Sequence, residues 1–247
     1  MGTGTAHDGI EVDRPGAVRR SAGGCDVTAA IELHVIARRF GRHWVLRGVD
    51  LTVQPGEVIG FTGRNGSGKT TLLRICATLL RPTRGDGRIF GRDLISEAAA
   101  VRHDVGMLAH ESAVYGSLTA AENLTFAVRM AGGHADRSRI DEALAEVGLL
   151  RTRDQRTRGF SAGMKRRLAL ARLLLRPPML LLLDEPYASF DADGVDRVNR
   201  FAQEVADRGG AVLVATHDLA RGRSVLQRNV EVRDGRMAGG ETLAGVV

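Results

Sequence analysis

The sequence has 247 residues, 43% of them hydrophobic, which is enough for one large globular domain or two small ones. The net charge of +6 is carried almost entirely by scattered arginines without interleaved aromatic residues, so composition argues against a nucleic-acid-binding surface. No apolar run reaches the roughly 20 residues that cross a bilayer, so a role at a membrane requires a partner chain.

Residues 1–30 are rich in Gly, Ala, Asp and Arg and lack apolar periodicity, so we expect a disordered extension there and a folded domain over 31–247. The extension contains no apolar segment of the kind that marks a secretory signal. Two cysteines, Cys25 and Cys76, provide no disulfide framework, which is compatible with a reducing cytoplasm.

The folded part opens with strand patterns. Residues 31–40 and 44–53 alternate apolar and polar positions, and the apolar run 58–61 leads into a glycine-rich loop. A helix is expected over 69–80, because its apolar residues share one face. These residues are Leu72, Leu73, Cys76, Leu79 and Leu80.

A mostly helical segment is expected from about 95 to 176, with a capping box from Thr119 to Glu122. Apolar runs at 179–183 and 211–215 then predict parallel strands covered on both faces. The pattern as a whole predicts an α/β fold, a βα core interrupted by a helical insertion.

The loop at 63–70 reads GRNGSGKT. Its glycines let the backbone wrap a phosphate, and its N–H groups point inward at the start of a helix. We expect Lys69 to reach the β- and γ-phosphates and the Thr70 hydroxyl to bind Mg²⁺. The loop residues expected to contact the nucleotide are Gly63, Arg64, Asn65, Gly66, Ser67, Gly68, Lys69, Thr70 and Thr71.

Two acids, Asp184 and Glu185, end the apolar run 179–183. At the carboxyl edge of a parallel sheet they would lie beside the phosphate loop. Asp184 suits the Mg²⁺ shell, and Glu185 suits the carboxylate that orients or deprotonates an attacking water. Alone, such a pair is more often two solvated acids; the loop upstream favours the catalytic interpretation.

From about residue 31 to its end, the sequence resembles the ABC ATPase family. The run FSAGM at 160–164 is similar to the family signature LSGGQ, with Ser161 and Gly163 retained. Ser161 would begin a helix that ends near Arg176. In the family this helix end faces the γ-phosphate held by another subunit, so the resemblance implies a dimer with two shared ATP sites.

Further positions match by the same resemblance. Asp191 lies where the family's D-loop communicates across the dimer, and His217 corresponds to the switch histidine that contacts the γ-phosphate. Phe40, followed by Gly41, matches the aromatic residue that stacks on adenine. We expect the competing aromatic residue, Trp44, to lie in the core.

His110 stands where the family's Q-loop normally has Gln. A neutral imidazole can still approach Mg²⁺ or its water, so His110 is a candidate metal ligand. This histidine, the short domain and the S-A-G signature make the chain similar to the ATP-binding subunits of haem exporters in cytochrome c maturation.

The resemblance implies a P-loop NTPase core of the ABC type with a mixed sheet, an N-terminal antiparallel β subdomain and a helical subdomain at about 95–176. It further implies an ATPase with ATP and Mg²⁺ as cofactors, acting as a homodimer or as a heterodimer with a second ATPase subunit. The dimer would power an integral membrane permease, an exporter, from the cytoplasmic face of the membrane. The helical segment, with the loop around His110, would contact that permease. The alternatives are an ABC ATPase that acts on nucleic acid and one that assembles iron–sulfur clusters.

Overall fold

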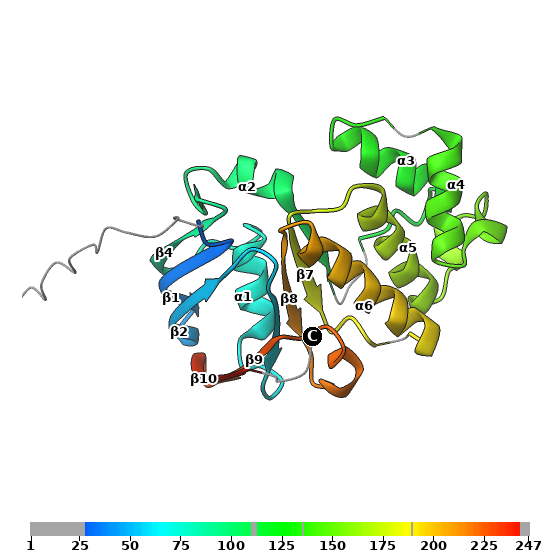
Figure 1. The fold of residues 1–247 in the computed structure, drawn as a ribbon. Helices are drawn as coiled ribbons and strands as arrows, with labels where there is room; N and C mark the ends of the chain where they lie inside the picture. Colours follow the sequence, from blue (N-terminus) through cyan, green and yellow to red (C-terminus); the bar gives the residue numbers. More distant parts are fainter. Residues whose placement is uncertain (1–27, 110–112, 135, 189, 243–247) are drawn as a thin grey trace, which may run out of the picture.

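The computed structural model describes residues 28–109, 113–134, 136–188 and 190–242. The molecule contains two sheets, and the helical subdomain lies at one end of it (Figure 1). The strands are β1 (Ile31–Phe40), β2 (His43–Val53), β3 (Val58–Thr62), β4 (Arg84–Ile89), β5 (Arg92–Asp93), β6 (Val105–Leu108), β7 (Leu180–Asp184), β8 (Ala211–Ala215), β9 (Arg228–Arg233) and β10 (Arg236–Thr242). The helices are α1 (Lys69–Cys76), α2 (Ala98–Asp104), α3 (Ala120–Met130), α4 (Arg137–Glu146), α5 (Ala162–Leu175) and α6 (Ala192–Asp207), with 3₁₀ turns at Leu150–Thr152, Thr157–Gly159 and Ala220–Gly222.

The smaller sheet has the order β2-β1-β4-β5 and is antiparallel throughout. Alternation places Ile31, Leu33 and Leu51 on its buried face. The N-terminal antiparallel subdomain expected from the sequence is therefore present.

The larger sheet has the order β10-β9-β3-β8-β7-β6. All its adjacent pairs are parallel except β9 with β10, so the sheet is mixed, as expected. Every residue of β7 and β8 is buried, because helices cover both faces of these strands.

Helix α1 lies between the two sheets, and α6 covers the opposite face of the larger sheet (Figure 1). Alternate residues of β7 enter the two cores: Leu180 and Leu182 pack with the α1 side, and Leu181 and Leu183 with the α6 side. The larger sheet is thus held from both sides, which fixes the ends of its strands.

The expected helical segment at 95–176 is interrupted by a strand. Residues 105–108 form β6, which pairs in parallel with β7 and belongs to the larger sheet. A four-residue apolar run next to a helix carries no periodicity that separates strand from helix, so this strand was missed. The helical subdomain itself consists of α3, α4 and α5, and α3 begins with the predicted capping box at Thr119 and Glu122.

Helix α1 is shorter than expected. It ends at Cys76, and Thr78 follows with a φ of 55°. The amide N–H groups of Leu79 and Leu80 both donate to Arg74 O, which turns the chain away, and Leu79 is 66% exposed. The prediction that Leu79 shares the apolar face of a helix over 69–80 is wrong.

None of the helices in the described ranges is long and apolar enough to cross a membrane. The expected extension at 1–30 lies outside the described residues up to position 27.

Candidate nucleotide-binding and catalytic site

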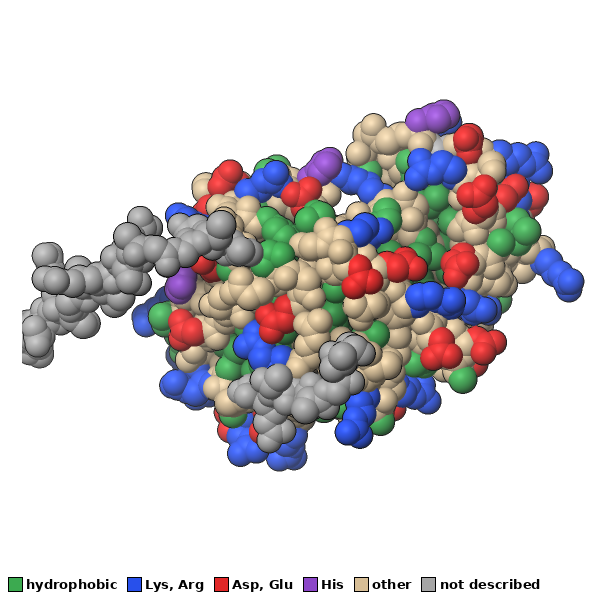
Figure 2. All heavy atoms as spheres, viewed as in Figure 1, with side chains coloured by type: hydrophobic (Ala, Val, Ile, Leu, Met, Phe, Trp, Pro, Cys, Tyr) green, Lys and Arg blue, Asp and Glu red, His purple; other side chains and the backbone are tan. Residues whose placement is uncertain are grey.

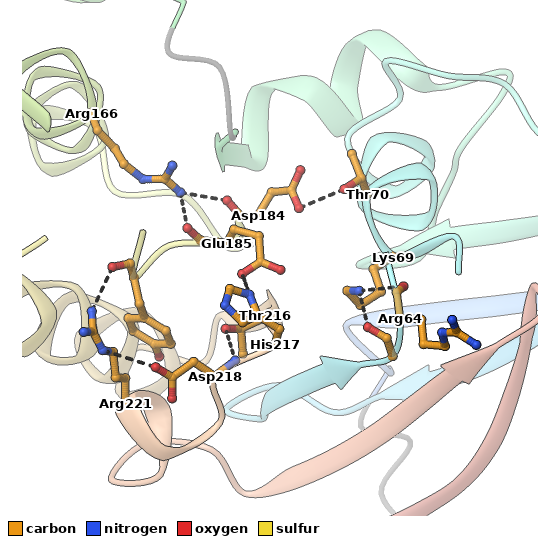
Figure 3. A network of polar contacts seen from close by, with 12 residues as sticks. Arg64, Lys69, Thr70, Arg166, Asp184, Glu185, Thr216, His217, Asp218 and Arg221 are labelled. Carbon is orange, nitrogen blue, oxygen red and sulfur yellow. Dashed lines mark hydrogen bonds and ion pairs between the residues drawn. The ribbon is translucent and has the colours of Figure 1, made fainter. Parts of the chain in front are cut away.

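Three adjacent parallel strands, β3, β8 and β7, deliver the candidate residues to one edge of the larger sheet. The loop at 63–70 follows β3, Asp184 ends β7, and Thr216 follows β8. Figure 3 shows Lys69, Thr70, Asp184, Glu185 and His217 gathered there. Ligand sites of parallel α/β sheets lie at this carboxyl edge.

The loop holds its lysine close to its own backbone. Lys69 is only 7% exposed, and its Nζ donates to Gly63 O at 2.7 Å and to Arg64 O at 3.3 Å. Gly63 has a φ of 140° and Gly68 a φ of 113°, values that essentially only glycine adopts. The ammonium group therefore lies at the N-terminus of α1, where a phosphate group is favoured.

The hydroxyl of Thr70 donates to Asp184 Oδ1 at 2.9 Å, across 114 positions of sequence. Asp184 is 3% exposed. A hydroxyl and a carboxylate oxygen side by side are the ligand type that Mg²⁺ prefers, so this pair fits the metal that the loop implies. The third metal candidate, His110, lies outside the described residues.

Glu185 and His217 contact each other through Glu185 Oε2 and His217 Nδ1, 2.8 Å apart. The carboxylate side chain is 21% exposed and the imidazole 72%, so both reach the surface of the site. Glu185 has a φ of 49°, in the left-handed region that a side chain with a Cβ rarely adopts. Strain of this kind clusters at functional sites.

A polar network fixes the segments that follow these residues. Arg221 Nε lies 3.2 Å from Asp218 Oδ2, and Arg221 Nη1 donates to Tyr187 O at 3.1 Å (Figure 3). The Tyr187 hydroxyl donates to Asn199 Oδ1 at 2.9 Å, and burial raises the pKa of Tyr187 above its usual range. The loop after Glu185 is thereby joined to the loop after His217.

Two cavities adjoin the loop. The larger, of about 880 Å³, is lined by His43, Trp44, Val45, Arg47, Arg64, Asn65, Gly66, Ser67 and Glu231 to Gly235. The smaller, of about 440 Å³, is lined by His43, Val45, Asn65 to Thr71 and Glu185. The two cavities share lining residues of the loop and of β2, and the smaller one reaches the Glu185 side.

The structure places the two aromatic candidates differently. Trp44, expected in the core, is half-buried and lines the larger cavity, because its strand β2 runs along the loop. Phe40 is 46% exposed and does not line that cavity. Arg38 lies over the Phe40 ring at 4.6 Å, and Arg39 and Arg84 lie 5.4 and 5.6 Å from the Trp44 ring.

Ser161 and Asp191 cap helices outside these cavities. Ser161 Oγ accepts from Met164 N at 3.2 Å at the start of α5, and Asp191 Oδ1 accepts from Gly194 N at 2.9 Å at the start of α6. With Gly163 in the first turn of α5, they form no part of either cavity lining. The structure brings the loop, Asp184, Glu185 and His217 together and leaves these three residues apart.

Sequence reasoning missed Arg166, whose contacts reach the two acids of the site. Its guanidinium donates to the backbone oxygens of Asp184 and Glu185. A signal was available: Arg166 shares a helical stripe with Ala169, Leu170 and Leu173, all buried, so it is a charge on an apolar face.

Residues 46–188, more than half of the chain, match the family described as ABC transporter. The chain belongs to the ABC transporter family. A cytochrome c biogenesis ATP-binding export protein of Cupriavidus metallidurans is 39% identical over 189 residues, which cover 76% of this chain and 90% of that protein. A protein of the same description from Methylococcus capsulatus is 39% identical over 177 residues, 72% of this chain and 86% of the relative.

The fold has close solved counterparts. The dimeric ATP-binding cassette MJ0796, in a post-hydrolysis state with ADP and Pi, matches with a TM-score of 0.79 and 26% identity over 87% of this chain and 99% of that one. The predicted ABC ATPase fold is thereby confirmed. As a member of this family, the chain is an ATP-hydrolysing subunit that powers transport.

We predict that Gly63→Ala disrupts the phosphate loop. An added Cβ would lie 2.2 Å from Val232 O, at a φ of 140° that alanine avoids, so the loop must move. We expect the free energy of unfolding, measured with urea, to fall by about 1–3 kcal/mol, and binding of a fluorescent ATP analogue to weaken.

The control is Gly239→Ala, because no atom lies within 4 Å of that added Cβ and the φ of Gly239 is not positive. Equal stability and affinity in both variants would contradict the assigned loop geometry.

Proposed function

We propose that two ATPase subunits, two copies of this chain or one copy with a second subunit, bind two ATP molecules with Mg²⁺ at their interface and drive a separate membrane permease that exports a haem-type substrate. The observation that carries this proposal is the arrangement of the Thr70–Asp184 and Glu185–His217 pairs beside the phosphate loop. A hydroxyl–carboxylate pair suits Mg²⁺, and a carboxylate–imidazole pair suits an attacking water and a γ-phosphate.

In the proposed reaction Lys69 exchanges its contacts with Gly63 O and Arg64 O for the β- and γ-phosphate oxygens. Thr70 and Asp184 would hold the Mg²⁺, which when bound neutralises the charge that develops on the phosphates. Glu185 orients or deprotonates the attacking water, and His217 holds the Glu185 carboxylate and contacts the γ-phosphate.

The positions of Ser161, Gly163 and Asp191 support a shared site. All three lie at helix N-termini, which favour anions, yet none lines the cavities of its own chain. A phosphate presented by a second subunit would complete the N-terminus of α5 at Ser161 and Gly163, whereas Asp191, itself a carboxylate, would face the second subunit across the interface; the dimeric state of the cassette MJ0796 is consistent with this. Loss of the γ-phosphate then removes a ligand that bridges two subunits.

We predict that Glu185→Gln binds ATP and accumulates as a dimer, because the amide cannot accept the proton of the attacking water. Hydrolysis should fall by about 100-fold or more. Lys69→Ala should bind ATP weakly, because it lacks the phosphate-binding ammonium group. Gel filtration in the presence of ATP measures dimer formation, and an assay of phosphate release measures hydrolysis.

Normal phosphate release from either variant would contradict the assigned roles. Gly239→Ala is the control in the same assays, and we expect it to bind and hydrolyse ATP like the unchanged chain.

Phe40 is proposed to stack on the adenine ring. One arginine lies over its ring and almost half of the residue is exposed, whereas Trp44 is less exposed and has two arginines beside its ring. Trp44 is the competitor because it lines the larger cavity.

We predict that Phe40→Ala weakens ATP binding by about 5- to 150-fold, since loss of one stacking contact costs about 1–3 kcal/mol. Trp44→Ala, measured beside it by equilibrium binding, should have the smaller effect. The reverse order would move the stacking role to Trp44.

The haem-type substrate is proposed from the two relatives described as cytochrome c biogenesis ATP-binding export proteins. His110 is likewise proposed as a metal ligand.

Basic and acidic side chains are interspersed on the face drawn in Figure 2, which does not present an unbroken basic stripe for nucleic acid. The proposed location is the inner face of the membrane, through the permease.

The helical subdomain is proposed to contact the permease through an apolar depression of about 380 Å³. Tyr115, Phe126 and Met130 line it and are 56%, 38% and 72% exposed. The rings of Tyr115 and Phe126 meet edge to face with centroids 5.0 Å apart. With Arg172 at the same depression, the surface suits a short apolar helix that carries an acidic residue.

We predict that Met130→Glu weakens co-purification with the membrane permease by about tenfold or more, because a charge is added to the apolar lining of this depression. Hydrolysis by the isolated subunit should stay unchanged, since Met130 is remote from the loop at 63–70.

The control is Leu79→Glu, which adds the same charge at a similarly exposed apolar residue beyond α1. Equal retention of the two variants on permease-containing membranes would contradict the proposed contact.

A further inference from the structure

Arg166 is a buried charge with an unusual set of partners. The residue is 4% exposed, and its Nη2 donates to Asp184 O at 2.8 Å and to Glu185 O. Its Nε has no hydrogen-bond partner within the part of the chain that the structure describes. Burial lowers the pKa of the guanidinium, and the nearby carboxylates of Asp184 and Glu185 oppose that shift. Replacing a buried ionic group by an apolar one is often neutral or stabilising, so stability alone does not explain a buried arginine here. We therefore look for its role in the contacts that it makes.

The two carbonyl groups that Arg166 binds, those of Asp184 and Glu185, lie on either side of the strained backbone of Glu185. Glu185 has a φ of 49°, which costs about 1–3 kcal/mol unless its surroundings hold it. On the opposite side, Glu185 N donates to Ala215 O at 2.8 Å. The peptide units before and after Glu185 are thus both anchored, and the carboxylate is directed to His217 (Figure 3).

Arg166 also belongs to the helix that Ser161 begins. Arg166 lies five positions after Ser161, the N-cap of α5, while Asp184 ends β7 and Glu185 follows it. One side chain therefore connects the signature helix to the catalytic carboxylate of the same subunit.

We propose that Arg166 is a positioning residue for ATP hydrolysis, which fixes the backbone of Glu185 and couples it to the signature helix. The inference rests on the proposed function, in which Glu185 serves one ATP site and Ser161 of the same chain serves the other. A shift of α5 at the second ATP site then changes the orientation of the Glu185 carboxylate at the first ATP site.

The test compares Arg166→Met and Arg166→Lys with the unchanged chain. Loss of the donor should lower kcat by about 10- to 100-fold, because small displacements of a catalytic group have effects of this size. The dissociation constant for ATP should change by less than about twofold, since Arg166 does not line the cavities. Lysine, which can reach one carbonyl, should recover part of the rate.

Arg139→Met is the matched control. Arg139 Nη2 donates to Leu175 O at the other end of α5, far from Glu185, so its loss should leave kcat unchanged. Thermal unfolding of each variant separates a folding defect from a lower rate. Unchanged kcat in Arg166→Met, or no recovery with lysine, would overturn the proposal.

A second arm separates positioning from simple support of α5. In a Glu185→Gln background, Arg166→Met should still accumulate as the ATP-bound dimer, because Ser161 is intact. Loss of that dimer would assign Arg166 to the signature helix alone and overturn the proposal. Failure of the proposed function has a different result, since Glu185→Gln by itself would then keep hydrolysing ATP.

Discussion

Parallel hydrogen bonding between β3, β8 and β7 is the constraint on which the site depends. Ala215 pairs with Phe61 on one side and with Asp184 on the other, so the three strands end at one level. The phosphate loop, the two acids and His217 each leave the sheet within a few residues of that level. A slip of one strand by one residue would turn its side chains to the opposite face and separate the pairs described above.

The burial of these strands explains why the arrangement is rigid. β7 and β8 contribute alternate side chains to two cores, one beside α1 and one beside α6. Movement of either strand would disturb close packing on both faces, and close-packed interiors tolerate little displacement. The loops that follow the strands carry the polar groups, so a stable framework supports the residues that change partners during a reaction cycle.

Contiguous motifs made much of the molecule predictable from sequence. The loop at 63–70, the acids after β7 and the capping box at Thr119 each depend on residues close together in the chain. Arg166 was not predictable in its role, because its acceptors are backbone atoms 18 and 19 positions away. β6 lacked a periodicity of its own, and the position of Trp44 depends on how two sheets pack. Such features follow from tertiary structure, which local patterns do not encode.

The central position of β3 has a consequence for synthesis of the chain. Its neighbours, β8 and β9, both come from the last quarter of the sequence; the Val58 amide, for example, binds the Gln227 side chain across 169 positions. A growing polypeptide therefore carries β3 with both edges unpaired until β8 and β9, more than about 150 residues further along, have been made. Folding must close these long loops late, and an apolar strand with open edges is a site for mispairing with other nascent chains.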